Sequence, residues 1–417
     1  MMPPNRTRIV SSLAELDAGS WDACANPVQT LPPAAPTGCG LGVDRTGERH
    51  NPFLSSAFLR ALEESGSVGP RTGWTPAHLC VENSGRLVAA APTYLKTNSQ
   101  GEYVFDHAWA DAYERAGGRY YPKIQVAVPF TPVTGRRFLV APEADRATAI
   151  DALVAGLRSL REQLKASSIH STFVTKVESD ELSSRGFLCR TDQQFHFLNE
   201  AYASFDDFLA SLASRKRKSI KRERKDALAH DITIERLTGA DLREDHWDAF
   251  FSFYMDTGSR KWGRPYLNRR FFSLIGASMP ERILLVMARR NGRYIAGALN
   301  LIGDDALYGR NWGAIEEHPF LHFEVCYYQA IDFAIERGLA RVEAGAQGEH
   351  KLARGYRPSL TYSVHDIADP RLARAIADYL RQERLYVENA VEVYGEHVPF
   401  RRDLQDRTPT TSDDPDR

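Results

Sequence analysis

Hydrophobic and polar positions along the chain follow two periods, and the alternation between these periods predicts strands and helices in a repeated order. Runs in which every second residue is apolar predict strands, and runs with apolar residues three and four positions apart predict helices. In the first half the pattern predicts a strand at 8–10, helices at 13–24 and 51–64, strands at 77–82 and 86–94, a helix at 144–165, a strand at 171–177, a short helix that ends at Gly186 and a strand at 194–198.

The second half repeats this order. Its pattern predicts a strand at 231–237, helices at 241–255 and 266–278, strands at 282–290, 294–302 and 307–312, a helix at 320–337, a strand at 339–344, a loop at 345–359, a strand at 361–367 and a helix at 369–388. Consecutive antiparallel strands followed by a strand–helix–strand crossover predict a mixed sheet. We therefore expect an α/β fold, or a layered α+β fold, built from two similar units.

Length and composition are typical of a soluble globular protein. The chain has 417 residues, of which 43% are hydrophobic and 26% are charged, enough for two or three domains of roughly 100–200 residues. The absence of a stretch of about 18 apolar residues predicts no membrane span, and residues 1–10 lack the apolar core of a secretory signal. Five cysteines without a CxxC pair argue against a zinc site or a disulfide framework. We expect a reduced, cytoplasmic protein.

The charge is distributed unevenly. Residues 214–225 contain eight basic residues and one acid, whereas the net charge of the whole chain is −1. A helix with this composition lies outside the core, and its cations, among them Arg215, Lys218 and Arg222, suit phosphate contact without base stacking. The alternative is a solvated helix that connects two domains.

Several long segments carry a resemblance to a known family. They are NPFLSSAFLRALEESGSV (51–68), EYVFDHAWADAYERAGGRYYPKIQVAVPFTPVTG (102–135), QFHFLN (194–199), SRKRKSIKRERKDA (214–227), DTGSRKWGRPYLNRRFF (256–272), IAGALNLIG (295–303) and LYGRNWGAIEEHPFLHFEVCYYQAIDFAIERGLARVEAGAQGEHKLARGY (307–356). In these motifs the chain resembles the FemAB-like, peptidoglycan biosynthesis/recognition family of predicted N-acyltransferases in the GNAT superfamily. The resemblance implies two tandem GNAT-like domains and acyl transfer to an amine.

The expected domain organisation follows from the element order and the resemblance. Residues 1–25 begin the first GNAT-like domain, 26–50 form a flexible Pro/Gly-rich insertion, and 51–203 complete that domain. Residues 204–230 form a basic helical connection, 231–400 the second GNAT-like domain, and 401–417 a disordered tail.

A turn after the predicted strand 307–312 bears on the donor. GNAT enzymes hold the coenzyme A pyrophosphate on backbone N–H groups at this place, and Arg310 and Gly313 match their loop. Ile315 departs from it, and Glu316 and Glu317 place negative charge beside a pyrophosphate. The loop is thus either a phosphate site or only a turn. Acyl-CoA and aminoacyl-tRNA both remain candidate co-substrates, and no tightly bound cofactor is expected.

The densest group of polar residues lies between positions 322 and 354. Acyl transfer to an amine needs a base and donors for an oxyanion. Glu343, Glu324 and His350 are candidate bases, and Lys351, Arg354 and the backbone N–H groups of residues 345–348 are candidate oxyanion donors. His322, Gln347, Glu349 and Arg354 are candidate substrate contacts. The alternative is that Glu343 pairs with Lys351 or Arg354 to fix the loop. Cys326 lies among apolar neighbours that favour packing over a nucleophilic role, and the spacing of the histidines does not indicate a metal site.

In the first half, polar residues are mixed with aromatic ones. Asp106, His107, Tyr121, Lys123 and Gln125 are candidate acceptor contacts; the same mixture also builds an ordinary domain interface. The basic turn 259–264 is either a binding site for a carboxylate or phosphate or a solvated loop.

The sequence thus favours a cytoplasmic GNAT-like N-acyltransferase that acts on a small-molecule or peptide amine. One alternative is an aminoacyl-tRNA-dependent transferase that acts on a peptidoglycan precursor. Another is a non-catalytic module that binds nucleic acid or an anionic precursor through residues 214–225. The oligomeric state is not predicted.

Overall fold

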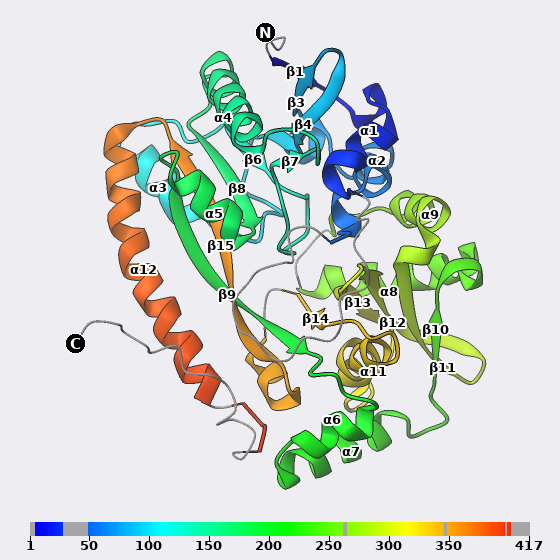
Figure 1. The fold of residues 1–417 in the computed structure, drawn as a ribbon. Coiled ribbons are helices and arrows are strands. Elements are labelled where there is room, and N and C mark those ends of the chain that lie inside the picture. Colours follow the sequence, from blue (N-terminus) through cyan, green and yellow to red (C-terminus); the bar gives the residue numbers. More distant parts are fainter. Residues whose placement is uncertain (1–4, 28–48, 262–264, 346–347, 397, 402–417) are drawn as a thin grey trace.

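The computed structural model describes residues 5–27, 49–261, 265–345, 348–396 and 398–401. Most of the insertion expected at 26–50 and of the tail expected at 401–417 lies outside the described residues. Strands form one large and one small sheet, and helices cover their faces (Figure 1). None of the described helices combines the length and the hydropathy needed to cross a bilayer.

The large sheet has eleven strands and runs through both halves of the chain. From one edge to the other the order is β10 (Thr233–Leu237), β11 (Ile283–Arg290), β12 (Arg293–Ile302), β13 (Ala306–Ala314), β14 (Arg341–Glu343), β9 (Leu188–Leu198), β15 (Arg357–Ile367), β8 (Ser168–Val174), β6 (Lys123–Val126), β5 (Thr93–Lys96) and β2 (Trp74–Pro76). At the centre β9 and β15 pair antiparallel from His196↔Arg357 to Leu188↔His365. Because β9 ends the first half and β15 the second, main-chain hydrogen bonds join the two halves.

The arrangement on either side of this central pair is similar. On one side β14 is parallel to β13, and β12, β11 and β10 follow antiparallel. On the other side β8 is parallel to β6, and β5 follows antiparallel. Pro92 separates β5 from β4, which belongs to the small sheet of β1 (Arg6–Val10), β3 (His78–Asn83), β4 (Arg86–Ala91) and β7 (Leu139–Val140). The α/β class, the mixed sheets and the tandem arrangement expected from the sequence are confirmed.

Helices pack on both faces of the sheets. They are α1 (Ala18–Ala25), α2 (Ser56–Glu64), α3 (His107–Arg115), α4 (Arg146–Gln163), α5 (Lys176–Ser183), α6 (Phe205–Ser211), α7 (Ser214–Ala227), α8 (Glu244–Lys261), α9 (Arg269–Ser278), α10 (Leu321–Phe323), α11 (Gln329–Glu336) and α12 (Pro370–Glu396). A π-helical turn, η7 (Glu324–Tyr328), joins α10 to α11, and a 3-10 helix, η8 (Glu349–Arg354), precedes β15. The other 3-10 helices are η1 (Leu13–Glu15), η3 (Pro52–Leu54), η4 (Pro70–Thr72), η5 (Gly239–Asp241) and η6 (Pro280–Arg282).

Aromatic side chains form the packed contact between the halves. The Phe53 ring lies 5.4 Å from Tyr308 on β13, and the Phe58 ring lies 5.6 Å from Phe271 on α9. Both pairs are edge-to-face, a favourable geometry for buried rings. On the outside of the central pair, α12 lies along β9 and β15 (Figure 1).

Several boundaries differ from the sequence-based expectation. The segment 102–135, expected only as a pocket, contains α3 and β6, and the helix expected at 320–337 contains the π-helical turn. The turn expected after residue 312 is wrong: β13 runs through Ala314, and Gly313 pairs with Gly297 of β12. The strand continues because β12 offers it a further ladder of hydrogen bonds, and this tertiary pairing overrides the turn preference of glycine.

Gly313 also allows a helix to pack closely. A Cβ at this position would lie 2.2 Å from the backbone carbon of Phe253 in α8, whereas a Cβ at Gly309 of the same strand would meet its nearest atom at 3.4 Å. We predict that Gly313→Ala lowers the free energy of unfolding by about 1–3 kcal/mol or more, since backbone must move. Gly309→Ala is the matched control and should change it by less than about 1 kcal/mol. Urea denaturation measures both, and equal effects would contradict the close packing of α8 on β13.

Candidate functional site

Two parallel strands of the second half separate partway along their length. β13 and β14 pair from Ala306↔Arg341 to Tyr308↔Glu343, where β14 ends, while β13 continues to Ala314. Within the described residues, no strand pairs with this edge of β13 beyond Tyr308. At the far end of this edge the Ala314 N–H donates to Thr257 of α8 at 3.2 Å, and the Ala314 carbonyl accepts from Arg260 at 3.0 Å. The unpaired stretch therefore lies between Tyr308 and Ala314. We call this space the β13–β14 opening.

The matching space in the first half is filled by the chain itself. β6 ends at Val126 while β8 continues to Val174. The Gly135 N–H donates to the Phe173 carbonyl at 3.0 Å, and the buried Arg137 guanidinium donates to the Thr172 carbonyl at 3.0 Å. The two spaces thus differ: main chain and Arg137 of the first half fill one, whereas two side chains of α8 bond the far end of the other at Ala314.

Three polar side chains, Gln194, His196 and Glu343, meet where β14 ends, and Lys351 lies near enough for its charge to act on His196. These four residues are here called the vertex cluster. One oxygen of Glu343, Oε1, accepts a hydrogen bond from Arg341 Nε at 2.9 Å. The other, Oε2, is buried without a hydrogen-bond partner and lies 3.9 Å from His196 Nε2. His196 Nε2 lies 3.3 Å from Gln194 Oε1. The cluster thus places a carboxylate oxygen beside a buried imidazole.

The charges around His196 favour a neutral ring. Burial lowers its pKa, and the positive charges of Arg341 and Lys351 lower it further, while Glu343 acts in the opposite direction. A neutral imidazole accepts a proton, and Glu343 beside it would stabilise the imidazolium that forms. The geometry can therefore support removal of a proton from a bound group.

Lys351 is a buried cation. Its side chain is 1% exposed, and burial lowers its pKa to about 8. Its Nζ donates to the Gly345 carbonyl at 2.9 Å. The pairing of Glu343 with Lys351 or Arg354, considered as an alternative from the sequence, is not formed: Glu343 pairs with Arg341, and Arg354 pairs with Glu223 of α7 at 2.9 Å. Lys351 has no carboxylate partner among the described residues.

Rings gather on the helical side of the opening. The His322 ring lies 5.2 Å from Trp312 and 6.3 Å from His350, and the Tyr327 hydroxyl is 2.8 Å from His350 Nε2. The structure therefore brings His322, His350, Lys351 and Arg354 into one region, as the sequence suggested. Gln347 lies outside the described residues, as does the side chain of Glu349.

The Glu324 side chain forms its hydrogen bonds outside the vertex cluster. It is fully buried in the π-helical turn and accepts two hydrogen bonds from Arg224 of α7, at 2.9 and 3.0 Å, and one from Gln329 at 2.7 Å. Its carboxylate fixes α7 to the body of the second half. A role of Glu324 as a base stays a prediction.

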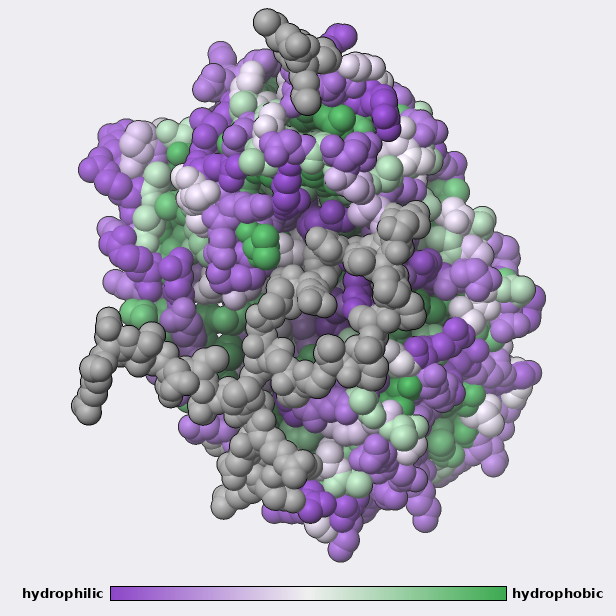
Figure 2. Space-filling view, viewed as in Figure 1, coloured by the Kyte–Doolittle hydropathy of each residue, from purple (hydrophilic) through white to green (hydrophobic). Residues whose placement is uncertain are grey.

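The outer face of α7 is cationic. Its inner face carries Glu223 and Arg224, which form the ion pairs just described, and the buried Ile220. The outer face exposes Arg215, Lys216, Lys218, Lys221, Arg222 and Lys225. Figure 1 shows α7 at the lower end of the molecule, where the surface in Figure 2 is largely hydrophilic. The predicted contacts Arg215, Lys218 and Arg222 are thus accessible, but they lie apart from the vertex cluster.

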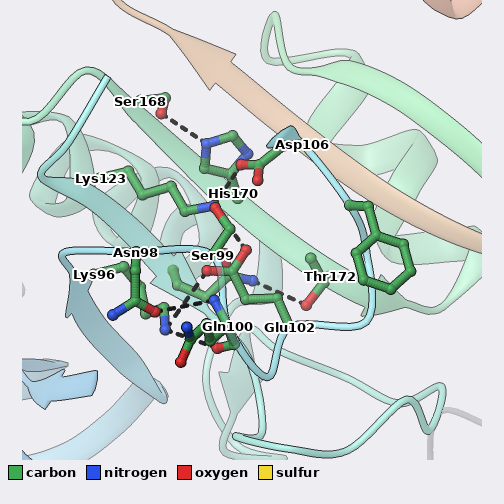
Figure 3. A network of polar contacts seen from close by, with 12 residues as sticks. Lys96, Asn98, Ser99, Gln100, Glu102, Asp106, Lys123, Ser168, His170 and Thr172 are labelled. Atoms are coloured by element: carbon green, nitrogen blue, oxygen red, sulfur yellow. Dashed lines mark hydrogen bonds and ion pairs between the residues drawn. The ribbon is translucent and has the colours of Figure 1, made fainter. Parts of the chain in front are cut away.

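The predicted acceptor contacts of the first half form a closed network (Figure 3). Lys123 donates to Ser99 at 2.8 Å, to Glu102 at 2.7 Å and to Asp106. Tyr121 bonds Ser99 at 2.8 Å, and Gln125 donates to Thr172 at 3.0 Å. His107 lies apart, exposed and stacked on Phe105. Lys123 and Lys96 balance the charges of Glu102 and Asp106, although Glu102 Oε1 and Asp106 Oδ1 are buried without a hydrogen-bond partner. A binding role of the network stays a prediction.

Some residues of the site were not predicted from the sequence. His196 and Gln194 lie on the same face of the predicted strand 194–198. Two polar residues on one face of a buried strand are unusual, and this was the signal that could have identified them. Tyr327, Glu223 and Arg341 had no such signal, since their partners come from distant segments. Within the described residues, no group of three side chains is arranged to hold a metal ion.

Comparisons with known proteins agree with this architecture. The model of the FemAB-like family, described as peptidoglycan biosynthesis/recognition, matches residues 12–402. Among solved structures, a conserved protein of unknown function from Bacteroides thetaiotaomicron is 11% identical, covers 88% of this chain and 100% of its own, and has a TM-score of 0.50. The crystal structure of FemX is 14% identical, covers 74% of this chain and 92% of its own, and has a TM-score of 0.48.

A tandem GNAT protein from the clavulanic acid biosynthesis pathway is 12% identical and covers 88% of this chain and 99% of its own, with a TM-score of 0.42. At these identities the likeness concerns the fold alone. The comparison with curated proteins gave no match.

The buried network of the first half yields a stability prediction. Burial raises the pKa of Asp106, but the Lys123 ammonium outweighs burial and holds the pKa well below its ordinary value. Lys123→Met leaves the buried Asp106 without its cation and leaves Glu102 with only Lys96, 3.7 Å away. We therefore expect the free energy of unfolding at pH 7 to fall by about 3–5 kcal/mol. The double variant Lys123→Met/Asp106→Asn should recover part of this loss.

The pH dependence provides a second readout. The folded pKa of Asp106 lies below the unfolded value of 3.8, so its contribution is complete above that value and is lost as the pH falls through the folded pKa. Wild-type protein should therefore lose stability below about pH 4 more steeply than Asp106→Asn. Urea denaturation between pH 3 and 7 measures this, and parallel curves would contradict the pairing of Asp106 with Lys123.

Proposed function

Because the chain belongs to the FemAB-like family of peptidoglycan biosynthesis/recognition proteins, we propose that it transfers an acyl or aminoacyl group to an amine in the β13–β14 opening. The vertex cluster carries this proposal. It combines a neutral buried imidazole, a carboxylate oxygen without a hydrogen-bond partner and a buried ammonium at the point where two strands separate. These are the groups that acyl transfer to an amine requires.

Each group has a role in the proposed reaction. The amine attacks the carbonyl carbon of the donor, and the new C–N bond forms as the ester or thioester bond breaks. His196 takes the proton that the amine loses and returns it to the leaving oxygen or sulfur, while Glu343 stabilises the imidazolium. The Lys351 ammonium stabilises the oxyanion of the tetrahedral intermediate. The protein supplies these groups from β9, β14 and η8.

The surroundings favour an aminoacyl-tRNA over an acyl-CoA as donor. The loop at 310–315, considered either as a pyrophosphate site or as only a turn, is strand through Ala314, and the segment that follows carries Glu316 and Glu317. In contrast, the cationic outer face of α7 suits a polynucleotide backbone. α7 is also tied to η8 through Glu223 and Arg354, and η8 carries Lys351. We propose a peptidoglycan precursor with a peptide amine as the acceptor.

The donor is tested by a transfer assay. The protein is incubated with a peptidoglycan precursor and either labelled aminoacyl-tRNA, charged with mixed amino acids, or labelled acetyl-CoA. Label that moves to the precursor from aminoacyl-tRNA alone supports the proposal. Transfer from acetyl-CoA alone would contradict the choice of donor. Binding of tRNA that weakens steeply with salt, without any transfer, would identify a non-catalytic module instead.

The lowered pKa of Lys351 predicts a pH profile. If its ammonium stabilises the oxyanion, the value of kcat/KM should fall above about pH 8, because burial lowers the pKa of the group to about 8. Lys351→Arg stays charged and should move this decline to higher pH. Lys351→Met should lower kcat/KM roughly 100-fold or more at pH 7 and remove the decline. An unchanged profile in Lys351→Met would exclude the proposed role.

A further inference from the structure

Arg310 occupies an irregular position in β13. Leu299 of β12 pairs with Asn311 and Asn300 pairs with Gly309, so Arg310 is the extra residue of a β-bulge. A bulge turns two successive side chains toward the same face of a sheet. Arg310 and Asn311 accordingly both line a small cavity between the halves, of about 10 Å³, together with Phe53, Phe130 and Leu267.

The charge of Arg310 is not neutralised. The guanidinium is half-buried, donates one hydrogen bond to the Phe130 carbonyl and lies beside the Tyr103 hydroxyl. No carboxylate among the described residues contacts it, and burial lowers its pKa. A guanidinium has five N–H donors in a planar fork, and Phe130 and Tyr103 are the hydrogen-bond partners of Arg310 among the described residues. Burial of a cation without an anion is costly, and such a site gains most from an anionic ligand.

Arg310 faces the same side of the sheet as the vertex cluster. Arg310 and Tyr308 both contact the Phe53 ring, at 5.8 and 5.4 Å. Tyr308 pairs with Glu343, and Glu343 pairs with His196 in the neighbouring strand. Arg310 is two residues beyond Tyr308, which corresponds to about 7 Å of strand.

One loop of the first half accepts hydrogen bonds both from Arg310 and from Gln194 of the vertex cluster. Its Phe130 carbonyl accepts from Arg310, and its Pro132 carbonyl accepts from Gln194 at 2.7 Å. The Phe130 ring stacks on the half-exposed Tyr266 with ring centres 4.8 Å apart. The loop therefore borders both the cation and the imidazole.

From this placement we propose that Arg310 binds a carboxylate of the acceptor while the acceptor amine lies at His196. The acceptor is then an amino acid or a peptide that carries both groups. This inference rests on the proposed transfer in the β13–β14 opening and names the chemistry of its acceptor. Arg310 is a specificity-determining residue here and takes no part in proton transfer.

The charge balance favours a carboxylate over a phosphate monoester. A carboxylate matches the single charge of the guanidinium and accepts two parallel N–H bonds from its fork. A phosphate monoester carries nearly two negative charges, and Glu343 lies on the same face of the sheet about two residues away. Glu343 would repel this second charge, and among the described residues no cation other than Arg310 contacts the Phe130 carbonyl or the Phe53 ring.

The test uses the full chain and two probe peptides, Nα-acetyl-Ala-Lys-Ala with a free carboxyl terminus and the same peptide as its C-terminal amide. We expect calorimetric titration to show that wild-type protein binds the free acid about 10- to 100-fold more tightly than the amide. Arg310→Met should lose this preference, and Arg310→Lys, which keeps the charge but not the fork, should keep part of it. Arg293→Met removes an exposed arginine of β12 and should keep all of it.

Other results would overturn the proposal. They are equal binding of the two peptides by wild-type protein, binding of neither peptide, a preference that survives in Arg310→Met, or displacement of the free acid by inorganic phosphate at constant ionic strength. Circular dichroism of each variant verifies that it is folded.

The transfer assay separates this inference from the proposed function. An Arg310-dependent preference without transfer to the free acid would refute the transfer and retain the carboxylate site. Equal rates of transfer to the acid and the amide would retain the transfer and refute the carboxylate site.

Discussion

The pairing of β9 with β15 is the constraint on which the rest of the structure depends. Each strand is the last of its half, and each lies between its partner and a strand of the other half. β9 therefore pairs with β14 as well as with β15, and this places His196 opposite Glu343. Without this exchange of edges, the imidazole of the first half and the carboxylate of the second would not meet. The vertex cluster is thus a product of the way in which the halves are joined.

The two halves have the same order of elements but different uses of the space between their parallel strands. In the first half, residues 127–138 and the buried Arg137 fill the space between the parallel strands. That half therefore contributes loop 129–132 and strand β9 to the site of the second half. In the second half, among the described residues, no strand pairs with this edge of β13 beyond Tyr308. Lys351 and Arg310 both lack a carboxylate partner among the described residues. This asymmetry is the basis on which we propose one reaction centre, bordered by loop 129–132 of the first half.

The sequence predicted the order of elements well because apolar periodicity is a local property. It predicted the crowding of His322, His350, Lys351 and Arg354, since these residues lie close together along the chain. It missed His196 because the significance of that residue depends on strand pairing across about 150 positions. It ended the strand at residue 312 because glycine favours turns, whereas the ladder with β12 extends the strand to Ala314. The ion pairs between α7 and the π-helical turn could not be predicted from the sequence either, because they join segments about 100 residues apart.

The central claim is that His196 accepts the proton of the attacking amine. The most direct measurement is the single-turnover rate of label transfer from aminoacyl-tRNA to the peptidoglycan precursor by His196→Gln, with exposed His230→Asn as the matched control. The account predicts a decrease of about 100-fold or more in His196→Gln, with tRNA affinity retained, and no change in the control. A rate in His196→Gln equal to that of the wild-type protein would contradict it.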